Sequence, residues 1–155
     1  MELKSLYREI LNEHNINPAH KAEMTNPSVT LQGVNPSCGD NITLYLKTDG
    51  KKITEGSFTG SGCAVSQASA DMMLDLIIGK DEKEALHLAD TFMAMIQGTA
   101  TQEQIEELDE AGALQDISHM PARVKCAVLG WRTMREIIQK GDTAASGSVA
   151  HCEAE

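Results

Sequence analysis

Hydrophobic side chains in residues 3–14 recur at the spacing of one helical face, and charged side chains occupy the other positions. This pattern predicts an amphipathic helix. Asn-Pro dipeptides follow at 17–18, 26–27 and 35–36, and each one favours extended or turn backbone. Within this otherwise irregular region we expect a short strand around 29–31.

Residues 42–47 alternate apolar and polar side chains, which is the two-residue period of a half-buried strand. Asp49-Gly50 comes next, and both residue types tolerate the positive φ angles of a tight hairpin turn. A return strand is expected over about 52–59. These segments together predict an antiparallel hairpin.

The second half of the chain is predicted to be helical. Apolar positions at helical spacing indicate helices over 64–78 and 81–97. Gly79 and Gly98 follow them, and glycine is the usual left-handed residue at the end of a helix.

Two further helices are expected towards the C-terminus. Thr101 and Gln104 have the spacing of a capping box, so a short helix is predicted to run through Leu108. Pro121 suits the first turn of a last, longer helix. Strands followed by a run of helices indicate an α+β fold: a small, mainly antiparallel three-stranded sheet with helices packed on one side.

The length of 155 residues is enough for one domain that buries a core without disulfide bonds. We expect this domain over residues 1–140. After Gly141 the residues are mostly small, polar or acidic, and they offer little apolar area to bury. A disordered acidic tail is therefore predicted over 141–155.

The formal net charge of −10 limits the classes of partner. Nucleic acids and anionic membranes are bound by basic surfaces, so neither is expected here. The first ten residues contain charged side chains and lack the apolar core of a signal peptide. No apolar run is long enough to span a membrane. A cytoplasmic location is expected, where thiols stay reduced.

Cysteines occur at positions 38, 63, 126 and 152. In a reducing compartment, cysteines are more typical of metal ligands or catalytic thiols than of disulfide bonds. Cys38 is separated from Asp40 by a glycine, which lets the backbone curl around a shared centre. This thiol and this carboxylate are therefore candidates for the same site.

Two other cysteines also have neighbours that favour a thiolate. Cys63 follows Gly60-Ser61-Gly62 and precedes a predicted helix, whose macrodipole favours negative charge. Cys126 lies in the last helix near the cations Arg123 and Lys125. Three thiolates and a carboxylate can complete a tetrahedral zinc site, and the thiolates can also hold an iron–sulfur cluster. The chain has no Cys-x-x-Cys pair, so buried cysteines without a ligand role stay an open alternative.

The chain closely resembles the IscU-like family of iron–sulfur cluster assembly proteins in three sequence runs, NPSCGD, GSGCAVSQASADMM and PARVKCAVLGW. The resemblance extends from about Leu6 to Gln139. Within the family the chain looks like the SufU branch, because Lys125 stands where the IscU branch has a histidine. A helical stretch over about 98–116 also resembles the SufU insertion.

The resemblance implies a zinc site formed by Cys38, Asp40, Cys63 and Cys126. SufU-like proteins accept persulfide sulfur from a cysteine desulfurase, a pyridoxal-phosphate enzyme, and Cys38 matches the acceptor position. Arg123 also matches a family position. Its functional interpretation is a cation that steadies the acceptor thiolate or persulfide, and the simpler one is a surface residue of the first helical turn.

Three functions are carried forward. The first is a zinc-dependent sulfur carrier that activates a desulfurase and supplies downstream iron–sulfur assembly proteins. Whether such a carrier is a sulfurtransferase enzyme stays open. The second is a scaffold on which a transient [2Fe–2S] cluster, held by Cys38, Cys63 and Cys126, is assembled and transferred. The third is a purely structural zinc protein, which is disfavoured because glycines beside the ligands place them on loops near the surface.

Other candidate ligands have simpler interpretations. Most methionines fall at apolar helical positions and are expected in the core. Four histidines share no short spacing and are expected to be surface or hydrogen-bonded residues: His14, His20, His87 and His119. Cys152 lies in the predicted tail, outside the family match, and is expected to be a dispensable, exposed thiol.

Overall fold

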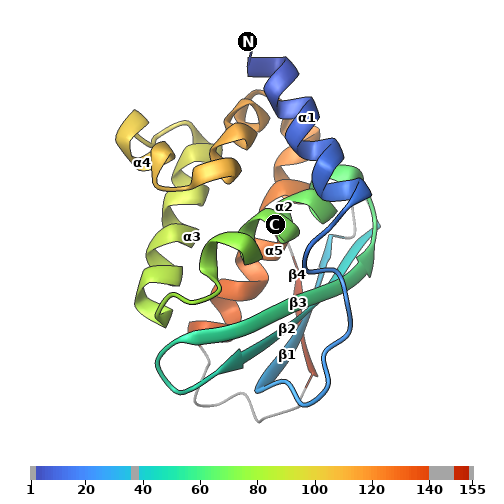
Figure 1. Ribbon diagram of the computed structural model, residues 1–155. Helices are drawn as coiled ribbons and strands as arrows, with labels where there is room; N and C mark the ends of the chain where they lie inside the picture. The colour runs from blue at the N-terminus through green and yellow to red at the C-terminus, as the bar shows by residue number, and fades with distance from the viewer. Residues whose placement is uncertain (1–2, 36–38, 140–148, 154–155) are drawn as a thin grey trace.

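A single sheet lies along one side of the molecule, and helices pack against it (Figure 1). The computed structural model describes residues 3–35, 39–139 and 149–153, with side chains described within 8–35 and 39–139. The strands lie in the order β3-β2-β1-β4. Their bounds are β1 Val29–Asn35, β2 Asp40–Thr48, β3 Ile53–Ser61 and β4 Val149–Glu153.

The first three strands form the antiparallel sheet that the sequence predicts. Strand β1 pairs with β2, and β2 pairs with β3, both antiparallel. Side chains of β2 alternate between buried and partly exposed from Asp40 to Lys47, because one face of the strand meets the helices and the other does not. Strand β1 is longer than expected and reaches Asn35, which pairs with Asp40.

The helices follow the predicted boundaries closely. They are α1 Leu3–Ile16, α2 Ala64–Ile77, α3 Glu82–Gln97, α4 Gln102–Glu106, the 3₁₀ segment η1 Asp109–His119 and α5 Pro121–Gln139. Gly98 ends α3 with a left-handed φ of 81°. The capping box of Thr101 and Gln104 is present at the start of α4. The predicted α+β class is confirmed.

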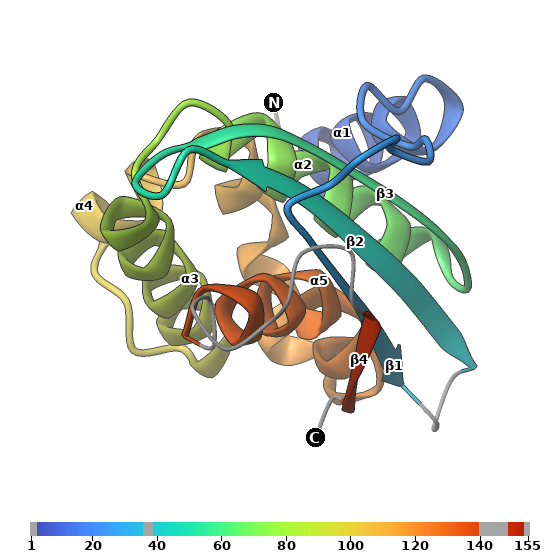
Figure 2. The same ribbon diagram turned by 90° about the horizontal axis from the view of Figure 1, so that it is seen from below.

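Helices α5 and α3 lie on one side of the sheet in Figure 2, and α2 and α5 pack against the strands directly. The core includes a stacked pair of rings, Phe92 of α3 and Trp131 of α5, whose centroids are 4.3 Å apart. Methionines fill the same core, as the sequence predicts: Met72, Met73, Met95 and Met134 are each at most 2% exposed. The sheet and the helices therefore hold the ends of β2, α2 and α5 in fixed relative positions.

The C-terminal tail differs from the expectation. Residues 149–153, predicted to be disordered, form strand β4, which pairs in parallel with the edge of β1. The sheet thus has four strands, three of them antiparallel. Backbone pairing with an open edge requires little apolar surface, so composition alone did not reveal it. The rest of the predicted tail lies outside the described residues, and the domain boundary at residue 140 stays a prediction.

The N-terminal helix is fastened to the body by a buried polar pair. His14 of α1 and Asp71 of α2 are 7% and 0% exposed, and His14 Nδ1 lies 2.6 Å from Asp71 Oδ2. Burial lowers the pKa of His14, but the hydrogen bonds and charges of Asp71 and Glu110 outweigh it and raise this pKa above its ordinary value. His14 is therefore a hydrogen-bonded residue, as the sequence analysis expects.

No helix within the described part of the chain is both long and apolar enough to cross a bilayer.

Candidate metal centre

Asp40 is the first residue of β2, and its side chain is 1% exposed. The antiparallel register places it opposite Asn35, the last residue of β1. Asn35 Nδ2 donates a hydrogen bond to Asp40 Oδ2 at 3.2 Å. The end of the β1–β2 ladder thus fixes one carboxylate oxygen.

The other carboxylate oxygen of Asp40 receives the backbone N–H of Cys63 at 2.8 Å. Cys63 is the N-cap residue of α2, with extended backbone angles. The preceding Gly62 has a φ of 140°, and a Cβ atom there would collide with the Asp40 carboxylate. Glycine is therefore required at position 62, because only a residue without a side chain lets the carboxylate reach the helix N-terminus.

Cys126 completes the cluster from α5, where its side chain is fully buried. Asn35 Nδ2 also donates towards Cys126 Sγ, at 3.8 Å. A carboxylate oxygen of Asp40 and the sulfurs of Cys63 and Cys126 all lie within 4.8 Å of one another. Residues that are far apart in the sequence therefore meet at one point.

The Asp40 carboxyl group is held in its ionised form. Burial raises its pKa, but hydrogen bonds from the Cys63 backbone, Cys126, Asn35 and Ser66 outweigh that effect and lower the pKa below its ordinary value. An ionised carboxylate is the form that coordinates a metal ion.

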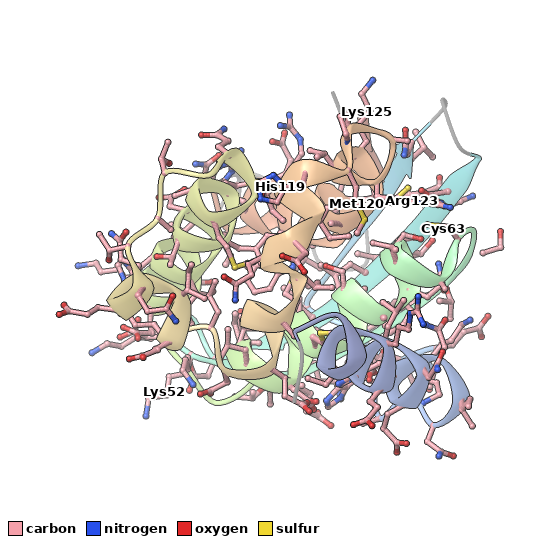
Figure 3. All side chains as sticks on the ribbon, turned by 90° about the horizontal axis from the view of Figure 1, so that it is seen from above. Lys52, Cys63, His119, Met120, Arg123 and Lys125 are labelled. Atoms are coloured by element: carbon pink, nitrogen blue, oxygen red, sulfur yellow. The ribbon has the colours of Figure 1, made fainter. Side chains whose placement is uncertain are left out.

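Arg123 lies on the solvent side of this cluster, two positions after the first residue of α5. Its side chain is exposed, and Figure 3 shows it next to Cys63, whereas Lys125 points elsewhere. The negative charges of Cys63 and Cys126, together with hydrogen bonds to both sulfurs, raise the pKa of the Arg123 guanidinium. The guanidinium of Arg123 therefore places a permanent positive charge beside the two sulfurs, on their solvent side.

The donor set fits a metal ion that prefers sulfur with one oxygen. Two cysteine sulfurs and one carboxylate supply three of the four positions of a tetrahedral zinc shell. Cys63 is only partly buried, so the cluster is open on one side. Cys38, the predicted fourth ligand and sulfur acceptor, lies outside the described residues, as does the side chain of Cys152. The complete four-residue ligand set stays a prediction.

Asn35, which donates to both Asp40 and Cys126, is a site residue that the sequence did not predict. Its amide oxygen is buried and has no hydrogen-bond partner among the described residues. The available signal was the Asn-Pro dipeptide that opens the NPSCGD run, which was interpreted only as a turn. His119 is exposed and is not part of the cluster in the described structure.

The fold and the cluster define a small α+β protein with a half-open group of candidate metal ligands at one end of its sheet. The chain belongs to the family of NifU-like N-terminal domains, whose sequence profile matches residues 6–127. This match confirms the family resemblance drawn from the three cysteine-containing runs.

Curated relatives specify the type more closely. The chain is 40% identical to the zinc-dependent sulfurtransferase SufU of Bacillus subtilis, over 89% of this chain and 92% of the relative. It is 39% identical to the iron–sulfur cluster assembly scaffold protein IscU of Streptococcus pyogenes, over 92% and 89%. The crystal structure of FiSufU from Fervidobacterium islandicum superposes with a TM-score of 0.78 at 32% identity, covering 86% of this chain and 97% of that one. The chain is thus of the IscU/SufU type.

Proposed function

We propose that the chain acts in iron–sulfur cluster assembly as a zinc-dependent sulfur carrier of the SufU branch. It accepts persulfide sulfur from a cysteine desulfurase on Cys38 and passes it to downstream assembly proteins in the cytoplasm. The observation that carries the proposal is the cluster of Asp40, Cys63 and Cys126 with the guanidinium of Arg123 at its open side. The Bacillus subtilis relative, which is named a zinc-dependent sulfurtransferase, supports the choice of metal.

Four residues would hold the zinc ion: Cys38, Asp40, Cys63 and Cys126. When bound, zinc keeps its cysteine ligands deprotonated and protects them from oxidation. Only Gly39 separates Cys38 from Asp40 in the chain, and Gly39 has a left-handed φ of 73°. Such backbone brings neighbouring residues round to one centre, which supports Cys38 as the fourth ligand.

The transfer itself is a thiol exchange that needs no external oxidant. The Cys38 thiolate attacks the terminal sulfur of the desulfurase persulfide, and a new sulfur–sulfur bond forms on Cys38. The sulfur–sulfur bond of the donor breaks, and the desulfurase cysteine leaves as a thiolate. Arg123 is placed to stabilise the anionic sulfur during this exchange, because its guanidinium already faces two sulfurs of the site.

Asn35 has a positioning role in this proposal. Its amide donates to both Asp40 and Cys126. These two ligands therefore keep their places when Cys38 leaves the site to react. Asn35, Asp40 and Cys126 lie on β1, β2 and α5, and Cys38 lies in the chain between β1 and β2.

The scaffold function is the second candidate. The IscU relative from Streptococcus pyogenes, named a scaffold protein, is nearly as similar as the SufU relative. The same three cysteines would hold a transient [2Fe–2S] cluster as the cargo. A closed, structural zinc site is less favoured, because Cys63 is partly exposed and the Arg123 side chain is exposed.

One experiment separates these functions. The purified protein is incubated with a cysteine desulfurase and cysteine, its zinc content is measured, and persulfide is mapped by mass spectrometry. We expect one equivalent of zinc and sulfane sulfur on Cys38. The Cys38→Ser variant should carry no persulfide, and the matched Cys152→Ser variant should be loaded like the original chain.

The other outcomes assign the other functions. A coloured cluster that survives gel filtration and transfers to an apo-acceptor protein would identify the scaffold. Zinc without any persulfide on Cys38 would identify a structural site. Persulfide on Cys152 instead of Cys38 would contradict the assignment of the acceptor.

A further inference from the structure

A second group of ionisable side chains surrounds His14, away from the cysteines. His14 is on α1, and both of its ring nitrogens contact carboxylates: Nδ1 lies 2.6 Å from Asp71 Oδ2, and Nε2 lies 3.0 Å from Glu110 Oε1. The imidazole is 7% exposed, so its direction is set by the surrounding helices. The sulfur-transfer site uses none of these residues.

Asp71 holds the inner side of this imidazole. It is fully buried on α2, and besides His14 it accepts the backbone N–H groups of Ala19 and His20, at 3.3 and 2.9 Å. These hydrogen bonds hold the Asp71 carboxylate in place against Nδ1 of His14. This is the arrangement in which a buried carboxylate orients a metal-binding histidine through its other ring nitrogen.

The outer nitrogen of His14, Nε2, contacts the Glu110 carboxylate, and the carboxylate of Asp75 lies close by. Ligand atoms of His14, Asp75 and Glu110 all lie within 4.8 Å of one another. Asp75 is on α2, one helical turn after Asp71, and Glu110 is on η1. The side chains of Asp75 and Glu110 are 46% and 59% exposed, so both carboxylates are accessible from solvent.

An open cavity of about 210 Å³ adjoins these two carboxylates. Its lining comes from α2, Leu108 and the start of η1, and includes Asp75, Asp109 and Glu110. Asp109 has a left-handed φ of 50°, which is uncommon for a residue with a side chain. The cavity gives a metal ion space for water ligands beside the protein ligands.

The charges of this group favour a cation. Asp71, Asp75, Asp109 and Glu110 contribute carboxylates from α2 and η1. The imidazoles that face them are those of His14 and of His20, whose Nε2 lies 2.7 Å from Asp75 Oδ1. Four carboxylates thus face two imidazoles, so the group carries a net negative charge in either form of the imidazoles.

We propose that His14, Asp75 and Glu110 form a second metal site that binds a divalent first-row ion through one nitrogen and two carboxylate oxygens. Ligands of this kind suit Mn²⁺ or Fe²⁺, whereas thiolates suit zinc. Asp71 is the positioning residue behind His14. The bound ion links α1, α2 and η1, so it also fastens the N-terminal helix.

Manganese is the probe for this site, because Mn²⁺ prefers oxygen and nitrogen ligands to thiolates. The protein is titrated as purified, with its cysteine site left as it is, and the loss of the free-ion Mn²⁺ signal is followed by electron paramagnetic resonance. We expect one equivalent to bind. Asp75→Asn and Glu110→Gln should each weaken binding by at least about tenfold, since each removes an ionised ligand.

Glu106→Gln is the matched control. It removes one acidic charge from the exposed end of α4, outside the ligand group, so binding should be unchanged.

A second readout is nuclear magnetic resonance. Mn²⁺ should broaden the ring signals of His14 far more than those of His87, which pairs with Glu107.

Three results would overturn the proposal. The first is no binding tighter than about 1 mM. The second is unchanged binding in both ligand variants. The third is an equal loss in Glu106→Gln, which would show attraction to the general acidic charge. Persulfide loading of Cys38 does not enter this test, so its outcome is independent of the proposed sulfur transfer.

Discussion

Asp40 combines two roles that are separable by mutation. It is a candidate metal ligand, and it also accepts the Cys63 N–H and the Asn35 amide, so it joins β1, β2 and the start of α2. Replacing it by asparagine keeps a hydrogen-bond acceptor for Cys63. Replacing it by alanine removes ligand and acceptor together.

We predict that Asp40→Ala releases zinc to a competing chelator faster than the original chain, since the carboxylate is the harder and more labile ligand. The variant should also lose about 1–3 kcal/mol in its free energy of unfolding, because the partly buried N–H of Cys63 and the buried amide of Asn35 lose their acceptor. Chelator-competition kinetics and urea unfolding measure the two effects. Glu103→Ala, an exposed change on α4, should alter neither. Unchanged zinc exchange in Asp40→Ala would count against this ligand assignment.

The role of Arg123 can be tested without disturbing the core, because its side chain is exposed. Arg123→Gln should lower the rate of persulfide loading on Cys38 by about tenfold, the effect of one charge-assisted hydrogen bond. Its melting temperature should stay within about 2 °C of the original. Lys125→Gln removes a cation from the same helix and should load at the original rate. Equal rates in all three proteins would make Arg123 a simple surface residue.

At the scale of elements, the turn from β3 into α2 determines whether the ligands meet. Gly62→Ala places a Cβ atom against the Asp40 carboxylate in a backbone conformation with φ of 140°. We expect a loss of at least about 2 kcal/mol in unfolding free energy, together with reduced zinc content. Gly50→Ala is the control, since Gly50 also has a positive φ, 93°, but nothing lies near its added Cβ. Its cost should be limited to about 1 kcal/mol of backbone strain, with full zinc content.

Local signals predicted most of the elements. The capping box at Thr101 and the left-handed Gly98 act within a few residues, so the sequence shows them directly, and both are present. The end of β1 was missed because Gln32, Gly33 and Asn35 interrupt the apolar pattern of the strand. Gly33 was part of that signal: a Cβ there would collide with Thr133 of α5, so the strand lies very close to the helix at this point.

The site was predictable in part for the same reason. Each cysteine has a local context, a glycine turn or a helix start, that favours a thiolate, so Cys63 and Cys126 were identified before their proximity was known. Contacts without local context were not predictable. Asp71 and His14 are 57 residues apart in the sequence and share no motif, and Asn35 had only the signature of a turn.

At the scale of the molecule, other segments pair with both edges of the three-stranded antiparallel sheet. Residues 20–22 pair with β3, where Ala22 N–H donates to Phe58 O at 2.9 Å. Strand β4 pairs with β1 on the opposite edge. A short outer strand and partial pairing of an edge both limit strand pairing between molecules. The tail therefore protects the sheet, although it adds little core.

A chain that ends at Gln139 lacks β4 and tests this role of the tail. Because a short edge strand gains hydrogen bonds but loses backbone entropy, its removal should lower the unfolding free energy by less than about 2 kcal/mol. The exposed edge of β1 should then cause self-association that increases with protein concentration, which analytical ultracentrifugation measures. A control chain that lacks only residues 154–155 keeps β4. Its self-association and its unfolding free energy should equal those of the full-length protein. If the shorter chain unfolds, β4 supports the core; if it does not associate, the edge of β1 is protected by other means.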